Sequence, residues 1–474
     1  MLFIPPRVRH GAGYLRRTLS TLIPQDSRAL PAASRALQGI LRGCLKIVNF
    51  STIYESTMDN SKQIEKAPRI VITGIGMVTP LGIGKNQFSH RLFAGDCAVA
   101  PVKSFDTSAL SSHCGAEVND FQPRDFISLK NIRRMDRISQ FTSAAARLAL
   151  EDAGLTVNTD NRDRIGIVLG TSFGATDVTV QFAGTLIKEG PAFVNPILVP
   201  NTVMNAAAGH TSIELGFRGV NTTVTHFAVS AETAIAYAVS EVRRGAADFI
   251  LTGGVDILSK FYYEALTRFH ALSPLDGKFE ESKPFDCDRN GMVVGEGCGI
   301  ICIESLESAL ARGRKPYCEM KGFGQSSSPA TPTGWPTDAA GVKKTISRAL
   351  ANAGITPPDI GVISAAANGG IILDRIEAEA YAEIFAGNKS GPWITALKGA
   401  LGESFSSGGI RACALALSFA KDALPPTCGL SNPLAQLKFV RQREEEIEIN
   451  NALLAGISFG GTYVYLVLGK CPDA

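Results

Sequence analysis

Apolar and polar residues along residues 219–254 change their spacing twice, and these changes predict a strand, a tight turn, a helix and a second strand. The helix is expected over Ala231–Val242, where alanine and other apolar residues recur at helical intervals. Two arginines in its last turn, followed by Gly245, favour a helix end at that point. A strand over Asp248–Thr252 follows and is expected to end at a pair of glycines. A chain segment of this kind positions one residue at the N-terminus of the helix.

That residue is Ala228, which has no chemically reactive side chain. Unpaired backbone N–H groups and the positive end of the helix dipole lower the pKa of a thiol at such a place and stabilise developing negative charge. A cysteine or serine is therefore expected there. The segment is arranged for a covalent intermediate that this chain cannot form.

The same segment resembles the active-site region of elongating β-ketoacyl-acyl-carrier-protein synthases, in which the acyl-accepting cysteine lies nine residues beyond the glycine at Gly219. Further motifs follow the family's order: RIVITGIGMVTPLG at 69–82, RRMDRISQFTSAAARLALEDAGL at 133–155, KPFDCDRNGMVVGEGCGIICIE at 283–304 and SFGGT at 458–462. The resemblance extends over residues 67–471 and includes several long motifs. It implies a member of the type that lacks the cysteine, known as a chain-length factor.

The fold implied by this resemblance is the α/β thiolase-like fold, with two similar βαβαβ halves in α-β-α-β-α layers. We expect the first half over residues 67–320 and the second over 321–474. FILTGGVD and LLAGISFGG look like equivalent strands of the two halves, each ending in a glycine turn. Residues 1–66 are expected to lie outside the fold.

The resemblance also implies two histidines that bind the thioester carbonyl of the malonyl donor. The position of the first is Ala366, in SAAANGG, and that of the second is Glu403, in KGALGE. The degenerate triad is thus Ala228, Ala366 and Glu403. The two threonines that hold the phosphopantetheine arm in the family are replaced by Asn368 and Gly370. A carboxylate cannot donate a hydrogen bond to a thioester oxygen unless it is protonated.

Three charged residues of the family pattern remain, namely Asp374, Glu377 and Lys398. We expect them to form an ion-pair network that holds the loops, with Lys398 bridging to Glu377. The alternative use of Lys398 is as a desolvated amine nucleophile.

The oxyanion donors implied by the resemblance are the backbone N–H groups of Ala228 and Phe459, which persist when side chains change. Ile457 occupies the place of a gating phenylalanine at the acyl pocket. His226 and Ser230 flank the missing nucleophile and are alternative candidates for chemistry. A single histidine on a buried strand is more often structural, and Ser230 is expected to bond to the backbone of the first helical turn.

Composition is that of a metabolic protein of 474 residues, 45% of them hydrophobic. A net charge of +3 gives no nucleic-acid footprint. Ten cysteines show no metal-ligand spacing and are expected to be reduced thiols. No apolar run reaches the roughly 18 residues of a membrane span. These features predict a cytoplasmic protein with no metal and no tightly bound cofactor.

Residues 1–57 form a basic leader with eight Lys or Arg residues and only Asp26 and Glu55 as acids. Such a leader resembles an organelle presequence, which would place the protein in an organelle. The alternative is that translation begins at Met58, a short distance before the first strand.

Three functions are consistent with these residues. The first is a non-catalytic partner that forms a heterodimer with an active ketosynthase in fatty-acid, polyketide or polyene synthesis, or pairs with itself as a homodimer. The second is an enzyme with altered acyl-transfer or malonyl-decarboxylase chemistry through Glu403, Ser230 or Lys398. The third is a protein that binds acyl groups or an acyl carrier protein, whose phosphopantetheine is then the ligand. We favour the first, because it explains both the retained motifs and the joint loss of three catalytic side chains.

Overall fold

The computed structural model describes residues 68–386, 391–444 and 446–471. The expected basic leader, and with it the choice between a presequence and a start at Met58, lies outside these ranges. The segment Ala67–Ala474 forms one compact unit. No helix within the described ranges is long and apolar enough to cross a membrane.

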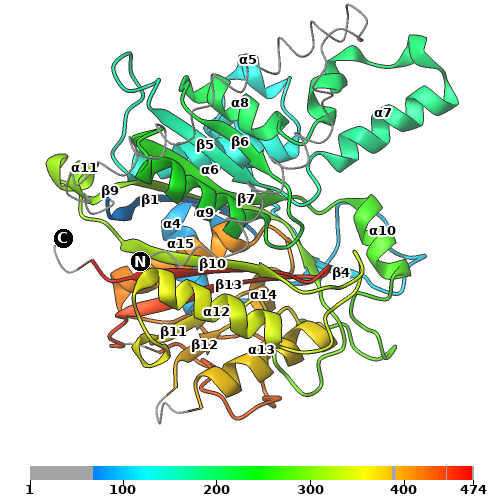
Figure 1. Ribbon diagram of the computed structural model, residues 1–474. Helices are drawn as coiled ribbons and strands as arrows, with labels where there is room; N and C mark the ends of the chain where they lie inside the picture. Colours follow the sequence, from blue (N-terminus) through cyan, green and yellow to red (C-terminus); the bar gives the residue numbers. More distant parts are fainter. Residues whose placement is uncertain (1–67, 387–390, 445, 472–474) are drawn as a thin grey trace, which may run out of the picture. The chain divides into compact units, whose positions relative to one another are not determined.

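Five strands of the first half lie side by side in the order β6-β5-β7-β9-β1 (Figure 1). β5 is parallel to both of its neighbours, whereas β9 is antiparallel to β7 and to β1. Their bounds are β1 (Ile70–Thr79), β5 (Ile165–Gly170), β6 (Asn221–Val224), β7 (Phe249–Asp256) and β9 (Gly297–Ser305).

The second half repeats this arrangement with the order β12-β11-β13-β14-β10. β11 is parallel to both neighbours and β14 antiparallel to both. An antiparallel contact between β1 and β10 joins the halves into one 11-stranded sheet. The α/β fold with two similar halves is therefore confirmed, and the expected division after residue 320 falls inside β10. The bounds are β10 (Cys318–Ser327), β11 (Val362–Ser364), β12 (Trp393–Thr395), β13 (Asn451–Ser458) and β14 (Thr462–Gly469).

Helices cover the outer faces of both halves and fill the space between them. α6 (Arg137–Asp152) packs on β1 and β9, and α12 (Ala340–Ala353) packs in the same way on β10 and β14. α9 (Ser230–Arg243) and α15 (Gly408–Lys421) contact each other and strands of both halves, so they form the central layer. The other helices are α4 (Gly84–Ala94), α5 (Leu129–Ile132), α7 (Thr176–Lys188), α8 (Ala206–Leu215), α10 (Lys260–Arg268), α11 (Leu306–Ala311), α13 (Ile371–Ile384) and α14 (Lys398–Leu401). Short strands are β2 (Gly82–Ile83), which pairs with β1, and β3 (Ala100–Pro101), β4 (Cys114–Ala116) and β8 (Val294–Gly295), which form a separate sheet.

The expected end of a strand at the glycine pair after residue 252 is wrong, because β7 continues through both glycines to Asp256. Gly253 adopts a φ of +151°, and a β-carbon there would lie 2.0 Å from the carbonyl oxygen of Gly299 on the adjacent strand. The glycine therefore serves close strand packing rather than a turn. In β13 the strand does end before its glycines, Gly460 and Gly461, both of which have positive φ.

Candidate functional site

The turn between β6 and α9 has the geometry of an elbow. Phe227 adopts a φ of +47°, a left-handed conformation that is costly for a bulky residue. Its carbonyl oxygen accepts hydrogen bonds from the Ser230 N–H at 3.0 Å, from the Ser230 hydroxyl at 2.7 Å and from the Ser172 hydroxyl at 2.7 Å. The Ser230 hydroxyl also accepts from the His226 N–H at 2.8 Å. These bonds hold Ala228 at the start of α9, and they commit Ser230 to the backbone, as expected.

Ala228 is 6% exposed and packs among apolar residues that include Leu258, Met292 and Phe405. Its backbone N–H donates to the hydroxyl oxygen of Ser458 at 3.3 Å. The expected oxyanion donor at this residue is thus engaged within the protein.

Two further predicted residues lie at the end of β13, beside the elbow. The Phe459 ring lies 4.9 Å from that of Phe227, centroid to centroid. Ile457, the expected pocket gate, is buried.

His226 lies in the elbow, and its side chain contacts the protein in the way expected of a structural residue. Its Nδ1 lies 3.1 Å from the hydroxyl of Thr233, one turn into α9. Burial lowers its pKa, which keeps the ring neutral near pH 7.

The turn after β11 is held by the carboxylate of Glu377. The backbone N–H of Ala366 donates to Glu377 Oε1 at 2.8 Å, and the Tyr381 hydroxyl donates to the same oxygen at 2.5 Å. Burial raises the pKa of Glu377. Ala366 itself offers only a methyl group where the resemblance implies an imidazole.

Asp374 accepts hydrogen bonds from the next residues of this turn. Its carboxylate accepts from the backbone N–H groups of Asn368 and Gly369, each at 3.1 Å, and of Phe285 at 2.8 Å. Burial raises its pKa to about 7 despite these donors. The N–H of Gly370 donates to the side-chain oxygen of Asn368 at 2.9 Å. The two residues at the pantetheine-turn positions are therefore bonded to each other.

Lys398 and Glu403 form a buried ion pair, with 2.6 Å between Nζ and Oε2 and each side chain 2% exposed. The same Oε2 accepts from Asn368 Nδ2 at 2.8 Å, and Oε1 accepts from the Phe405 N–H at 2.8 Å. The expected bridge from Lys398 to Glu377 is wrong, because Glu377 bonds to Tyr381 and the turn while Lys398 pairs with Glu403. The arrangement joins three predicted site residues: Asn368, Lys398 and Glu403.

Asp256, at the end of β7, is a site residue that sequence reasoning missed. Its carboxylate accepts from the backbone N–H groups of Ser172 and Phe173, each at 3.1 Å, and of Ser406 at 3.0 Å. Burial raises its pKa to about 6. Asp256 thereby connects the loop after β5 to the loop before α15. In the sequence, an acidic residue at the end of a buried apolar strand was the feature that could have identified it as a site residue.

A second buried ion pair, between Glu232 on α9 and Arg411 on α15, was also missed. Arg411 Nη1 donates to the carbonyl oxygens of Ala455 at 2.6 Å and Ala365 at 3.1 Å. Burial raises the pKa of Glu232. In the sequence, the only indication of this pair is one charged residue on the otherwise apolar face of each helix.

In the ranges that the structure describes, no thiol and no imidazole ring bonds to Ala228, Ala366 or Glu403, and the hydroxyl at Ser458 accepts from the Ala228 N–H. The groups present are two methyl groups and an ion-paired carboxylate, which accepts hydrogen bonds but does not donate them. Among the described residues, no three His, Cys, Asp or Glu side chains are grouped to hold a metal ion. The hydrogen bonds and the ion pair of this site hold its loops in place.

Comparison with known proteins gives two family matches along the chain. Residues 67–309 match the N-terminal domain of beta-ketoacyl synthases, and residues 317–431 match the C-terminal domain. The 3-oxoacyl-[acyl-carrier-protein] synthase 2 of Synechocystis is 33% identical over 407 residues, which cover 85% of this chain and 98% of that protein.

Two solved structures are similar over most of the chain. One is described as the ishigamide ketosynthase/chain length factor, with 30% identity, a TM-score of 0.78, and coverage of 86% of this chain and 100% of the other. The second is a beta-ketoacyl synthase from Burkholderia phymatum, with 26% identity, a TM-score of 0.79, and coverage of 85% and 100%.

Proposed function

Since the chain belongs to the beta-ketoacyl synthase family, we propose that it is a non-catalytic subunit that pairs with an active ketosynthase and helps to set the length of the acyl product. In this role it acts as a chain-length factor in fatty-acid, polyketide or polyene synthesis. The observation that carries the proposal is Ala228, a methyl group on an elbow whose supporting hydrogen bonds are all present.

The other two triad positions support the same conclusion. Ala366 cannot bind a thioester oxygen through its side chain, and Glu403 is paired with Lys398. A partner subunit needs the loops of the site, and these are held by the carboxylates of Asp256, Asp374 and Glu377. It does not need the nucleophile.

A surface for such a partner lies around β6. This strand ends the sheet order, so one of its edges has no neighbouring strand among those described. Large apolar side chains are exposed on the following elbow and on the two flanking helices: Phe227 is 43% exposed, Ile213 on α8 is 70% exposed and Tyr237 on α9 is 42% exposed. Exposed apolar side chains beside an unpaired strand edge favour association with a second protein. One similar structure is described as a ketosynthase/chain length factor, and we infer a partner of that ketosynthase type here, with self-pairing as the alternative.

The enzyme alternative is less well supported. Ser230, Lys398 and Glu403 would have to act as nucleophile or base, yet each is bonded within the protein. Binding of a carrier protein alone is also less well supported, because a phosphopantetheine arm would meet Asn368 and Gly370, whose polar groups are bonded to each other.

The test is a condensation assay with malonyl-loaded and acyl-loaded carrier proteins, on this chain alone and after co-purification with a candidate ketosynthase. Carbon dioxide release and product length are followed together. We expect activity only in the mixture, and shorter products when Ile457→Phe narrows the buried end of β13. Leu310→Phe, on the exposed surface of α11, is the matched control and should leave product length unchanged. Carbon dioxide or product from the chain alone would contradict the proposal.

A further inference from the structure

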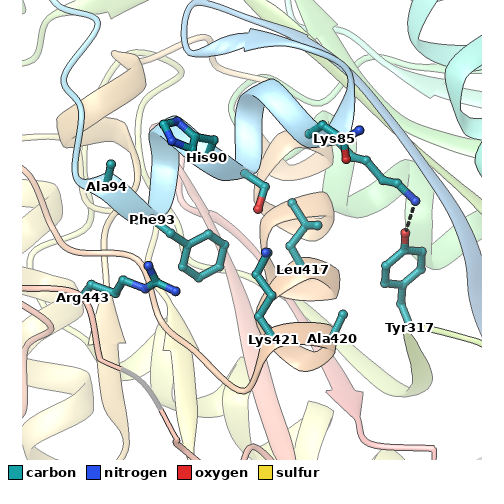
Figure 2. A pocket seen from close by; sticks show the side chains of 11 residues that line it. Lys85, His90, Phe93, Ala94, Tyr317, Leu417, Ala420, Lys421 and Arg443 are labelled. Atoms are coloured by element: carbon teal, nitrogen blue, oxygen red, sulfur yellow. Dashed lines mark hydrogen bonds between the residues drawn. The ribbon is translucent and has the colours of Figure 1, made fainter.

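A cavity of about 560 Å³ lies between α4 and the end of α15. Tyr317, just before β10, and Arg443 complete its wall. Figure 2 shows Phe93 on α4 and Lys421 on α15 pointing toward each other, with Arg443 approaching the ring from a third segment. We call it the α4–α15 cavity. It includes none of the residues of the degenerate triad, and its volume is in the range of small-molecule sites.

The described lining of this cavity is rich in basic side chains. Lys85, His90, Lys421 and Arg443 line it, and among the described residues no carboxylate does. Lys85 forms an ion pair with Asp152 and donates to the hydroxyl of Tyr317, so its charge is largely compensated. The Lys421 ammonium and the Arg443 guanidinium each lie 5.9 Å from the centre of the Phe93 ring. Two cations thus converge on one apolar surface.

A buried hydroxyl gives a second, independent indication of a ligand. Ser89 lines the cavity and is 6% exposed, and within the described part of the chain its hydroxyl oxygen has no hydrogen-bond partner. A buried hydroxyl without a partner is costly and is uncommon in folded proteins. Such a group is satisfied if a ligand oxygen reaches it.

We propose that the α4–α15 cavity binds a small soluble phosphate ester. Lys421 and Arg443 contact the phosphate oxygens, the Ser89 hydroxyl donates to one of them, and the organic part packs on Phe93 and Leu417. Arginine and lysine beside a neutral donor are the side chains that bind phosphate in proteins. An apolar floor selects an ester over inorganic phosphate. This inference is independent of the role in condensation proposed above.

The test is calorimetric titration of the full chain with phenyl phosphate, with inorganic phosphate as the second probe. We expect saturable binding of phenyl phosphate that is tighter than binding of inorganic phosphate. Lys421→Ala should weaken it by about tenfold, the usual effect of one charged hydrogen bond. Ser89→Ala should weaken it by about threefold without lowering thermal stability, because the hydroxyl has no partner to lose in the free protein. Lys344→Ala removes an equal charge from the exposed face of α12 and should have no effect.

Two outcomes would overturn the proposal. One is binding that Lys344→Ala weakens as much as Lys421→Ala, which would indicate attraction to net charge alone. The other is binding only to phosphatidylcholine vesicles that contain phosphatidic acid, with no binding of the soluble ester, which would assign the cations to a lipid surface.

Discussion

In each half of the chain, the outermost strand of the sheet is connected to a helix of the central layer, and the two connections differ. In the first half, residues 225–229 join β6 to α9 in a tight elbow, whereas in the second half residues 396–407 join β12 to α15 in a long loop that includes α14. Each connection has a phenylalanine at positive φ, Phe227 at +47° and Phe405 at +53°. The connections meet where the Ser172 hydroxyl bonds to the Phe227 carbonyl and lies 3.1 Å from the Ser406 hydroxyl.

The difference shows two ways of fixing a loop at a site. The elbow has alanine at its centre and is held by uncharged hydrogen bonds, partly within its own few residues and partly to the hydroxyls of Ser172 and Ser458. The long loop is held by the buried Lys398–Glu403 pair, whose members are each needed to compensate the other. The elbow thus depends on neutral hydrogen bonds, while the long loop depends on charges.

The largest expected effect is on the long loop. Lys398→Ala leaves the Glu403 carboxylate buried without its cation, and removal of one partner of a buried pair costs about 3–5 kcal/mol of the free energy of unfolding. Urea denaturation measures this, and Lys344→Ala, an exposed lysine on α12, is the control. A loss below about 1 kcal/mol would mean that the loop does not depend on the pair.

The buried carboxylates of the two halves, Asp256 in the first and Asp374 in the second, are expected to affect stability at different pH values. Burial raises the pKa of Asp374 to about 7 and that of Asp256 to about 6, against an ordinary value of 3.8. The folded protein therefore binds these protons more tightly than the unfolded chain, so their contribution is present below about pH 4 and is lost as the pH rises through about 6 and 7. The change in the free energy of unfolding between low and high pH should become smaller by about 4 kcal/mol in Asp374→Asn and by about 3 kcal/mol in Asp256→Asn. Unfolding by urea at about pH 5 and about pH 8 tests this, and an unchanged slope in Asp374→Asn would refute it.

The two phenylalanines test the packing of each connection. Phe405 is buried, with its ring 4.8 Å from that of Phe173, whereas Phe227 is 43% exposed. Phe405→Ala should lower the free energy of unfolding by about 3 kcal/mol, and Phe227→Ala by about 1, because less apolar area is lost. The difference in urea midpoint between the two variants is the measurement. Equal losses of unfolding free energy would show that the elbow depends on the Phe227 ring as much as the long loop depends on the Phe405 ring.

The smallest effect is expected within the elbow. Ser230→Ala removes the acceptor of the His226 N–H and should cost about 1 kcal/mol, the usual value for one such bond. Thermal unfolding of Ser230→Ala measures this cost. Ser240→Ala is the control, since the Ser240 hydroxyl donates to the Ala236 carbonyl one turn back in α9. A condensation activity that disappears in Ser230→Ala would instead assign Ser230 a chemical role.

Local features of this chain could be predicted from its residues, and long-range pairings could not. The helix after the elbow, expected over Ala231–Val242, is observed at Ser230–Arg243, because alanine spacing and the terminal glycine act locally. The choice of partner for Lys398 depends on Gly402, whose positive φ turns Glu403 back toward the lysine. The Glu232–Arg411 pair joins two helices that each appear apolar, so their meeting depends on the packing of both halves.

One edge of β6 has no neighbouring strand among the described residues, and this affects how the protein must be produced. An uncovered strand edge flanked by exposed apolar side chains is a template for unspecific strand addition. Chains synthesised in excess of whatever covers this edge would be prone to aggregate. If the proposed partner covers this edge, balanced synthesis of the two chains keeps this one from aggregating.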